Sequence, residues 1–103
     1  MVRRYEILLP LRSNAGQTFP EELAVQTLLE LEERFGAASA ETQVIRGMWR
    51  HEGVRYRDEL VRVFVDIADS PEVREFFREF KETLKARFQQ LDIWMTSYPV
   101  EVH

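Results

Sequence analysis

Residues 60–80, LVRVFVDIADSPEVREFFREF, contain the transition that decides the fold. Residues 60–67 are rich in β-branched side chains, which predicts a strand. Ser70 and Pro71 then predict a helix start, with Ser70 as the N-cap and a proline at the first helical position, where its missing N–H costs nothing. The apolar residues that follow, as far as Phe88, recur with a helical period. We therefore expect a buried strand that leads directly into an amphipathic helix.

The segment before this transition predicts a strand and a first helix. Residues 5–11 place Tyr5, Ile7, Leu9 and Leu11 at alternate positions, the period of a strand with one face on a core. Thr18-Phe19-Pro20-Glu21 has the form of a capping box and predicts that a helix begins there. Gly36 predicts the left-handed end of that helix.

A hairpin and a final strand complete the pattern. Residues 41–50 predict a second strand, and residues 51–54, with Gly53, predict the turn that returns the chain to residues 60–67. Leu91, Ile93 and Met95 alternate with other side chains, which predicts a fourth strand that ends at Pro99.

The resulting order, βαββαβ, predicts an α+β fold of the ferredoxin-like plait type. In this fold an antiparallel four-stranded sheet has the order 4-1-3-2, and both helices cover one face. The chain has 103 residues, of which 45% are hydrophobic and 31% charged. This size and composition suit one domain over residues 1–103.

Composition also argues against several classes of function. The chain has no cysteine, so it has no disulfide and no thiolate metal site. Its N-terminal sequence lacks the apolar run of a signal peptide, and no segment approaches the ~20 apolar residues of a membrane span, so we expect a cytoplasmic protein. A formal net charge of −4 argues against nucleic acid as the main partner.

The sheet face opposite the helices is the predicted functional surface. The strand alternation places on it Glu6, Leu8, Arg62, Phe64, Asp66, Trp94, Thr96 and Tyr98. Apolar and aromatic side chains at this density rival the largest patch of a typical monomer, ~300–600 Å². We expect an interface or ligand face at Leu8, Arg62, Phe64, Trp94 and Tyr98. The favoured hypothesis is that two chains pair through this face. Ordinary local packing and a small-molecule surface are the alternatives.

Three charged residues of this face are weak catalytic candidates. Glu6, Arg62 and Asp66 fall on central strands, where an apolar setting would raise a carboxylate pKa and allow acid–base chemistry. The favoured alternative is structural, with Arg62 bridging two carboxylates at an interface.

The hairpin carries a histidine and a group of arginines. His51 stands at the predicted turn with no second His or Cys at ligand spacing, so we expect a solvated turn residue and neither a metal site nor a cofactor. Arg46, Arg50, Arg55, Arg57 and Arg62 would bind an anion or a nucleic-acid backbone. However, Glu52, Asp58 and Glu59 are interleaved with them, and the glycine pattern of RNA-recognition strands is missing.

Two short motifs carry a resemblance. Gly47-Met48-Trp49 and Arg87-Phe88-Gln89-Gln90 resemble a Gly-x-Trp and an Arg-Phe-x-Gln motif of small uncharacterised bacterial proteins with the ferredoxin-like plait. That resemblance implies a fold but no activity. More distantly, the plan is similar to the dimeric α/β-barrel superfamily, where two open sheet faces enclose a pocket for small organic substrates or haem.

The sequence thus favours a homodimeric module without catalysis of its own, which acts in interaction or in small-ligand sensing. The alternative is a dimeric α/β-barrel enzyme that uses Glu6, Arg62 and Asp66 in a cavity lined by Trp94.

Overall fold

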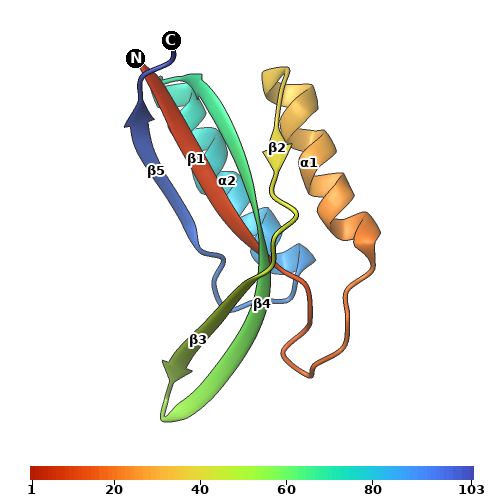
Figure 1. Ribbon diagram of the computed structural model, residues 1–103. Coiled ribbons are helices and arrows are strands. Elements are labelled where there is room, and N and C mark those ends of the chain that lie inside the picture. Colours follow the sequence, from red (N-terminus) through yellow and green to blue (C-terminus); the bar gives the residue numbers. More distant parts are fainter.

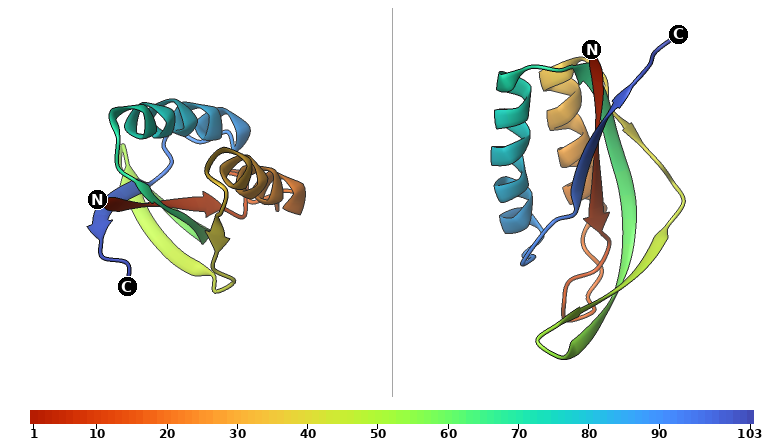
Figure 2. Two further views of the ribbon diagram at one scale, coloured as in Figure 1. Left: turned by 90° about the horizontal axis from the view of Figure 1, so that it is seen from above. Right: turned by 90° about the vertical axis from the view of Figure 1, so that its left-hand side faces the viewer.

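The computed structural model describes all residues, 1–103, as two helices packed on one five-stranded antiparallel sheet. The strands are β1 (Val2–Pro10), β2 (Ser39–Ala40), β3 (Ile45–His51), β4 (Val54–Ala68) and β5 (Met95–Val100), and the helices are α1 (Glu21–Phe35) and α2 (Pro71–Arg87). Both helices lie on the same side of the sheet, and its other face carries no helix (Figure 1, Figure 2). The α+β class and the ferredoxin-like arrangement agree with the sequence pattern.

The strand order corrects one detail of the prediction. The path through the sheet is β2-β4-β1-β5, and β3 pairs with β4 beyond β2. Of the predicted second strand, residues 41–50, only residues 45–50 form a strand, as part of β3, whereas β2 lies before the predicted range. The four-stranded order 4-1-3-2 therefore does not match as written. Residues 41–44 interrupt the pairing, although the Glu41 N–H still donates to the Arg62 carbonyl at 2.9 Å.

β4 is the longest strand and extends past the rest of the fold. Its second half pairs with β1 from Leu60 to Ala68, whereas its first half pairs only with β3. The β3–β4 hairpin consequently projects beyond both helices (Figure 1). Glu52 and Gly53 close it with φ values of 49° and 78°, a turn with two left-handed residues that suits the strand twist.

The core forms where the sheet meets the helices. Its buried members are Tyr5, Ile7, Leu9, Leu31, Val63, Val65, Phe77, Phe80, Leu84, Phe88 and Ile93. Tyr5 stacks on Phe77 with ring centroids 3.9 Å apart, and Phe35 stacks on the same Phe77 at 5.4 Å. The alternation of β1 and β4 thus places Tyr5, Ile7 and Leu9 under the helices as predicted, whereas Leu11 lies beyond the end of β1 and is not part of the core.

The helix boundaries confirm one capping prediction and correct another. Ser70 Oγ accepts a hydrogen bond from the Val73 N–H at 3.1 Å, as expected for an N-cap followed by proline. The prediction of a capping box at Thr18 was wrong. Pro20 stands at the N-cap of α1 without a side-chain hydrogen bond, because Thr18 bridges back to Arg12 as a short β-type pair.

The final strand starts later than its sequence pattern indicates. Leu91 and Ile93 belong to the loop after α2, and β5 begins at Met95 and includes Pro99, opposite Arg3. Ile93 is buried as predicted, but Leu91 is 64% exposed and does not lie under the helices. A proline is tolerated there because β5 is an edge strand.

Arg87 joins the two helices, so we predict that Arg87→Ala destabilises the fold by about 1–2 kcal/mol. The side chain is only 11% exposed, and its guanidinium donates to both Glu30 carboxylate oxygens, at 2.7 and 2.9 Å, and to Thr27 Oγ1. Urea unfolding measures the loss. The matched control is Arg78→Ala, whose ion pair with Glu75 is 72% exposed on the arginine side and worth little. Equal losses in the two variants would contradict the assignment.

Candidate functional site

A chain of polar contacts crosses the middle of the open sheet face. Glu6 on β1 accepts a hydrogen bond from the Tyr98 hydroxyl at 2.7 Å, and its other oxygen lies 3.5 Å from Arg62 Nε on β4. Arg62 also donates to Glu41 at 3.0 Å. The Arg62 Nε is buried and makes no hydrogen bond. Three strands and the segment after β2 therefore meet in one charged network.

A second ion pair lies beside this network. Arg4 donates to both oxygens of Asp66, at 2.7 and 2.9 Å, and its guanidinium carbon lies 4.6 Å from the centroid of the Phe64 ring. The fork of hydrogen bonds from Arg4 holds the pKa of Asp66 below its ordinary value and raises the pKa of Arg4. Phe64 is thus partly covered by a charged side chain of its own chain.

The structure divides the three catalytic candidates between two ion pairs. Glu6 and Arg62 are neighbours, as the strand register requires, since Leu8 is opposite Arg62 and Glu6 is opposite Phe64. Asp66 forms its pair with Arg4, so the acid–base candidates belong to two adjacent ion pairs. Arg4 and Glu41 were not singled out from the sequence. Arg4 has the same strand parity as Glu6, which is the signal that could have identified it.

The apolar part of the open face lies farther along the sheet, toward the hairpin. A groove of about 760 Å³ runs between the end of β1, the hairpin and the loop after α2. Its lining includes Leu8, Pro10, Gly47, Met48, Trp49, His51, Asp58, Leu60, Lys85, Gln90, Leu91, Asp92, Ile93 and Trp94. Trp94 is 65% exposed and Met48 70% exposed. The predicted Leu8 and Trp94 therefore share this groove, whereas Arg62, Phe64 and Tyr98 lie in or beside the polar network.

An aromatic pair stiffens the hairpin wall of the groove. Trp49 stacks on Tyr56 with centroids 4.5 Å apart, and its indole N–H donates to Asp58 at 2.6 Å. His51 lies at the end of β3, 48% exposed and 3.9 Å from the Glu52 carboxylate. The groove wall is thus held in shape by contacts within the hairpin alone.

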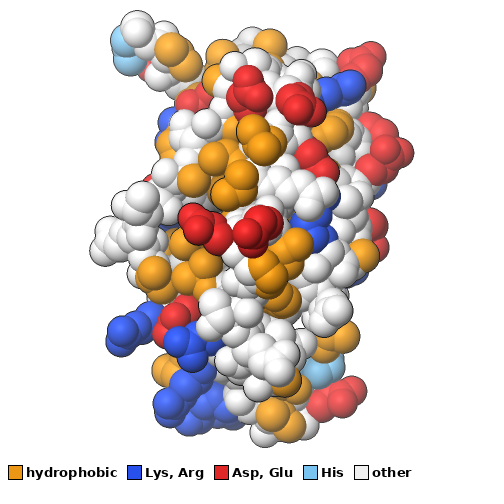
Figure 3. All heavy atoms as spheres, turned by 90° about the vertical axis from the view of Figure 1, so that its right-hand side faces the viewer, with side chains coloured by type: hydrophobic (Ala, Val, Ile, Leu, Met, Phe, Trp, Pro, Cys, Tyr) orange, Lys and Arg blue, Asp and Glu red, His pale blue; other side chains and the backbone are white.

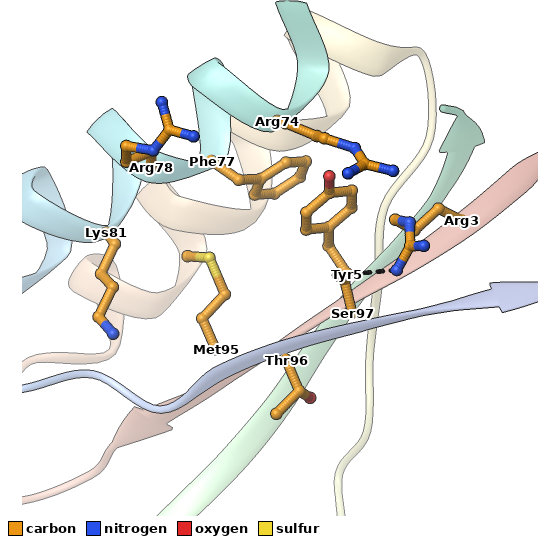
Figure 4. Close-up of a pocket in the computed structure, with 9 residues that line it drawn as sticks. All are labelled: Arg3, Tyr5, Arg74, Phe77, Arg78, Lys81, Met95, Thr96 and Ser97. Atoms are coloured by element: carbon orange, nitrogen blue, oxygen red, sulfur yellow. Dashed lines mark hydrogen bonds between the residues drawn. The ribbon is translucent and has the colours of Figure 1, made fainter. Parts of the chain in front are cut away.

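A smaller cleft of about 250 Å³ lies between α2 and β5 (Figure 4). Arg3, Arg74, Arg78 and Lys81 surround it, with Tyr5, Phe77 and Met95 as its apolar lining. Each of these cations already has a carboxylate partner: Asp69 for Arg3 and Arg74, Glu75 for Arg78 and Asp92 for Lys81. The two arginines hold the pKa of Asp69 at about 2. The charges of this cleft are therefore largely balanced within the chain.

Two kinds of feature are absent from the fold. No group of three or more His, Cys, Asp or Glu side chains is arranged to hold a metal ion. No helix is both long enough and apolar enough to cross a membrane.

Comparisons with solved structures identify the architecture. The chain is similar to the divalent cation tolerance protein Cut A1 of Thermus thermophilus, with 17% identity over 100% of this chain and 87% of that one and a TM-score of 0.67. A phage SAM lyase in complex with S-methyl-5'-thioadenosine matches with a TM-score of 0.75, 14% identity, and coverage of 94% and 80%. The periplasmic divalent cation tolerance protein CutA of Archaeoglobus fulgidus matches with a TM-score of 0.66, 17% identity, and coverage of 100% and 87%.

These similarities establish the fold and leave the function open. No protein-family model matches the chain, and no curated protein sequence matches it. At 10–17% identity, the same arrangement occurs in proteins named for cation tolerance and in a lyase. Since one fold supports unrelated functions, we infer function from the surfaces of this chain.

The contact between Glu6 and Tyr98 predicts a measurable titration. The hydrogen bond to the Glu6 carboxylate raises the pKa of Tyr98 above its ordinary value of about 10, with burial as a further cause. Glu6→Gln removes the negative charge that disfavours the phenolate, so the Tyr98 pKa falls toward that value. NMR of tyrosine ring carbons measures it. Glu101→Gln, at a side chain that is 91% exposed, serves as the control without effect. An unchanged Tyr98 pKa in the Glu6 variant would disprove the contact.

Proposed function

We propose that this protein is a non-catalytic interaction module that works as a homodimer, in which a second copy covers the groove at the hairpin end of the open face. The observation that carries the proposal is the exposure of large apolar side chains around one hollow: Trp94 at 65% and Leu91 at 64%. Burying a large apolar side chain contributes about 1.5–3 kcal/mol. Two such side chains offer several kcal/mol before the entropy cost of association.

The projecting hairpin supports the same proposal. Residues 54–58 of β4 have a partner strand on one side only, and a two-stranded hairpin is marginally stable by itself in water. A second chain against the groove would shelter both the Trp49–Tyr56 wall and the free side of β4. The polar network around Glu6 and Arg62 then lies next to the contact and sets its orientation, in the structural role expected of Arg62.

Binding of a small molecule in the groove is the second candidate function. A volume of about 760 Å³ lies within the ~300–1,000 Å³ of ligand pockets, and aromatic walls with a few polar groups are typical of them. One neighbour in fold, the phage lyase, holds S-methyl-5'-thioadenosine. The groove would then be either a ligand-sensing site or the substrate pocket of an enzyme in which Glu6, Arg62 and Asp66 are the catalytic residues. We also propose that the protein is located in the cytoplasm.

Trp94→Glu tests the homodimer, because it places a charge in the centre of the apolar groove. We expect a parent that is dimeric at micromolar concentration and a variant that has lost this dimer, as measured by light scattering on a sizing column at ~0.5 M salt, where contacts between exposed charges are screened. Val102→Glu is the matched control, since Val102 is 70% exposed outside the groove. A parent that is monomeric at every concentration would refute the homodimer.

Native mass spectrometry of the purified parent separates the two candidates. A small molecule that remains bound to the parent and is lost in Trp94→Glu would favour the ligand-binding function. Dimers without added mass favour the interaction module.

A further inference from the structure

The hairpin arginines differ from nearly all other cations of the chain in having no carboxylate partner. Ion pairs within 4.0 Å involve Arg3, Arg4, Arg12, Arg62, Arg74, Arg78, Lys81, Lys85 and Arg87. Arg34 lies over the Phe76 ring instead. The remaining four, Arg46, Arg50, Arg55 and Arg57, are all exposed and all belong to β3 and β4.

Strand register places these four side chains on one face of the hairpin. Arg50 is directly opposite Arg55, and Met48 is opposite Arg57. Asp58 has the other parity and bonds to Trp49 on the opposite face, so it does not neutralise them. Glu59 shares their face, but its carboxylate pairs with Arg12 at 3.7 Å. A like-charge pair directly across two strands costs stability unless an anion lies against it.

Figure 3 shows the resulting separation of charge. Lys and Arg side chains gather at the lower left, at the hairpin end of the molecule, whereas Asp and Glu side chains occupy much of the upper part and the right margin. The four arginines, named here the basic hairpin face, stand on a chain whose formal net charge is −4. A long polyanion would be repelled by the rest of such a chain, which favours a compact acidic surface as the partner.

The outer face of α1 has the complementary character. Glu21, Glu22 and Glu33 have no cation within 4.0 Å, and they line one shallow hollow together with Val25 and Leu29. Val25 is 46% exposed and Leu29 53% exposed. From Glu21 to Glu33 the helix rises ~18 Å, and from Arg46 to Arg50 the strand rises ~13 Å, so the two surfaces are similar in length. Both combine unpaired charges of one sign with exposed apolar side chains, Val25 and Leu29 on α1 and Met48 on the hairpin.

We propose that the basic hairpin face of one copy docks on the outer face of α1 of a second copy. Guanidinium–carboxylate pairs form around a small apolar centre, in which Met48 meets Val25 and Leu29. The contact is head-to-tail, because each copy contributes a different surface, and it therefore leads to rings or open chains of molecules. It is separate from the groove contact and does not depend on it, apart from Met48 at the border of the two surfaces.

Complementary charge reversal tests the docking. One variant carries Arg50→Glu and Arg55→Glu, and the other carries Glu21→Arg and Glu33→Arg. Either variant alone places like charges against each other, so its head-to-tail association weakens at least about tenfold. In an equimolar mixture, the basic hairpin face of the second variant meets the acidic α1 of the first, and association returns. Sedimentation velocity in low salt, with circular dichroism to verify folding, measures both results.

Controls distinguish this contact from the proposed homodimer and from general charge effects. Arg78→Glu and Glu79→Arg on α2 change the net charge in the same directions without touching either surface, and we expect association as in the parent. Trp94→Glu retains head-to-tail association, which disappears at ~0.5 M salt as the Debye length shortens. The proposal is overturned if the mixture does not associate, if only the arginine variant loses association, or if the hairpin arginines bind a single-stranded oligonucleotide in competition with self-association.

Discussion

Strand β4 is the element on which the rest of the structure depends. It pairs with β1, β2 and β3, and its alternation divides side chains between a core of Val63 and Val65 and an open face with Arg62 and Phe64. Because β4 is longer than β1, its first half continues past the end of the helical layer. The projecting hairpin follows from that difference in length, and the groove forms where the hairpin, the end of β1 and the loop after α2 meet.

The open face has two parts with different physical character. Around Glu6 and Arg62, charges are paired across strands, and Arg4 lies over Phe64 in the same way. Toward the hairpin, Trp94 and Leu8 border a hollow in which Trp94 and Leu91 are largely exposed. Satisfied ion pairs resist burial less than isolated charges do, so the first part tolerates a neighbouring molecule while the second gains from one.

The sequence pattern predicted which side chains lie on this face better than it predicted the contacts between them. Leu8, Phe64, Trp94 and Tyr98 were placed on it by strand alternation. The sequence could not predict which of these side chains are occupied by polar contacts. The hydrogen bond from Tyr98 to Glu6 and the position of Arg4 over Phe64 depend on the register of three strands that are distant in sequence. The late start of β5 has a similar cause: Leu91 and Ile93 alternate like a strand, but β1 pairs with β5 only as far as Ile7.

By itself, the sequence determined the α+β class, the Ser70 cap and the apolar faces of α2 and β4, because these depend on local periodicity and local hydrogen bonding. Only the tertiary structure decided how charges are distributed on the hairpin. In the sequence Asp58 and Glu59 follow Arg55 and Arg57 and dilute them. In the fold Asp58 turns to the opposite face, and Glu59 pairs with Arg12. The pairing of strands therefore created a basic face that linear spacing conceals.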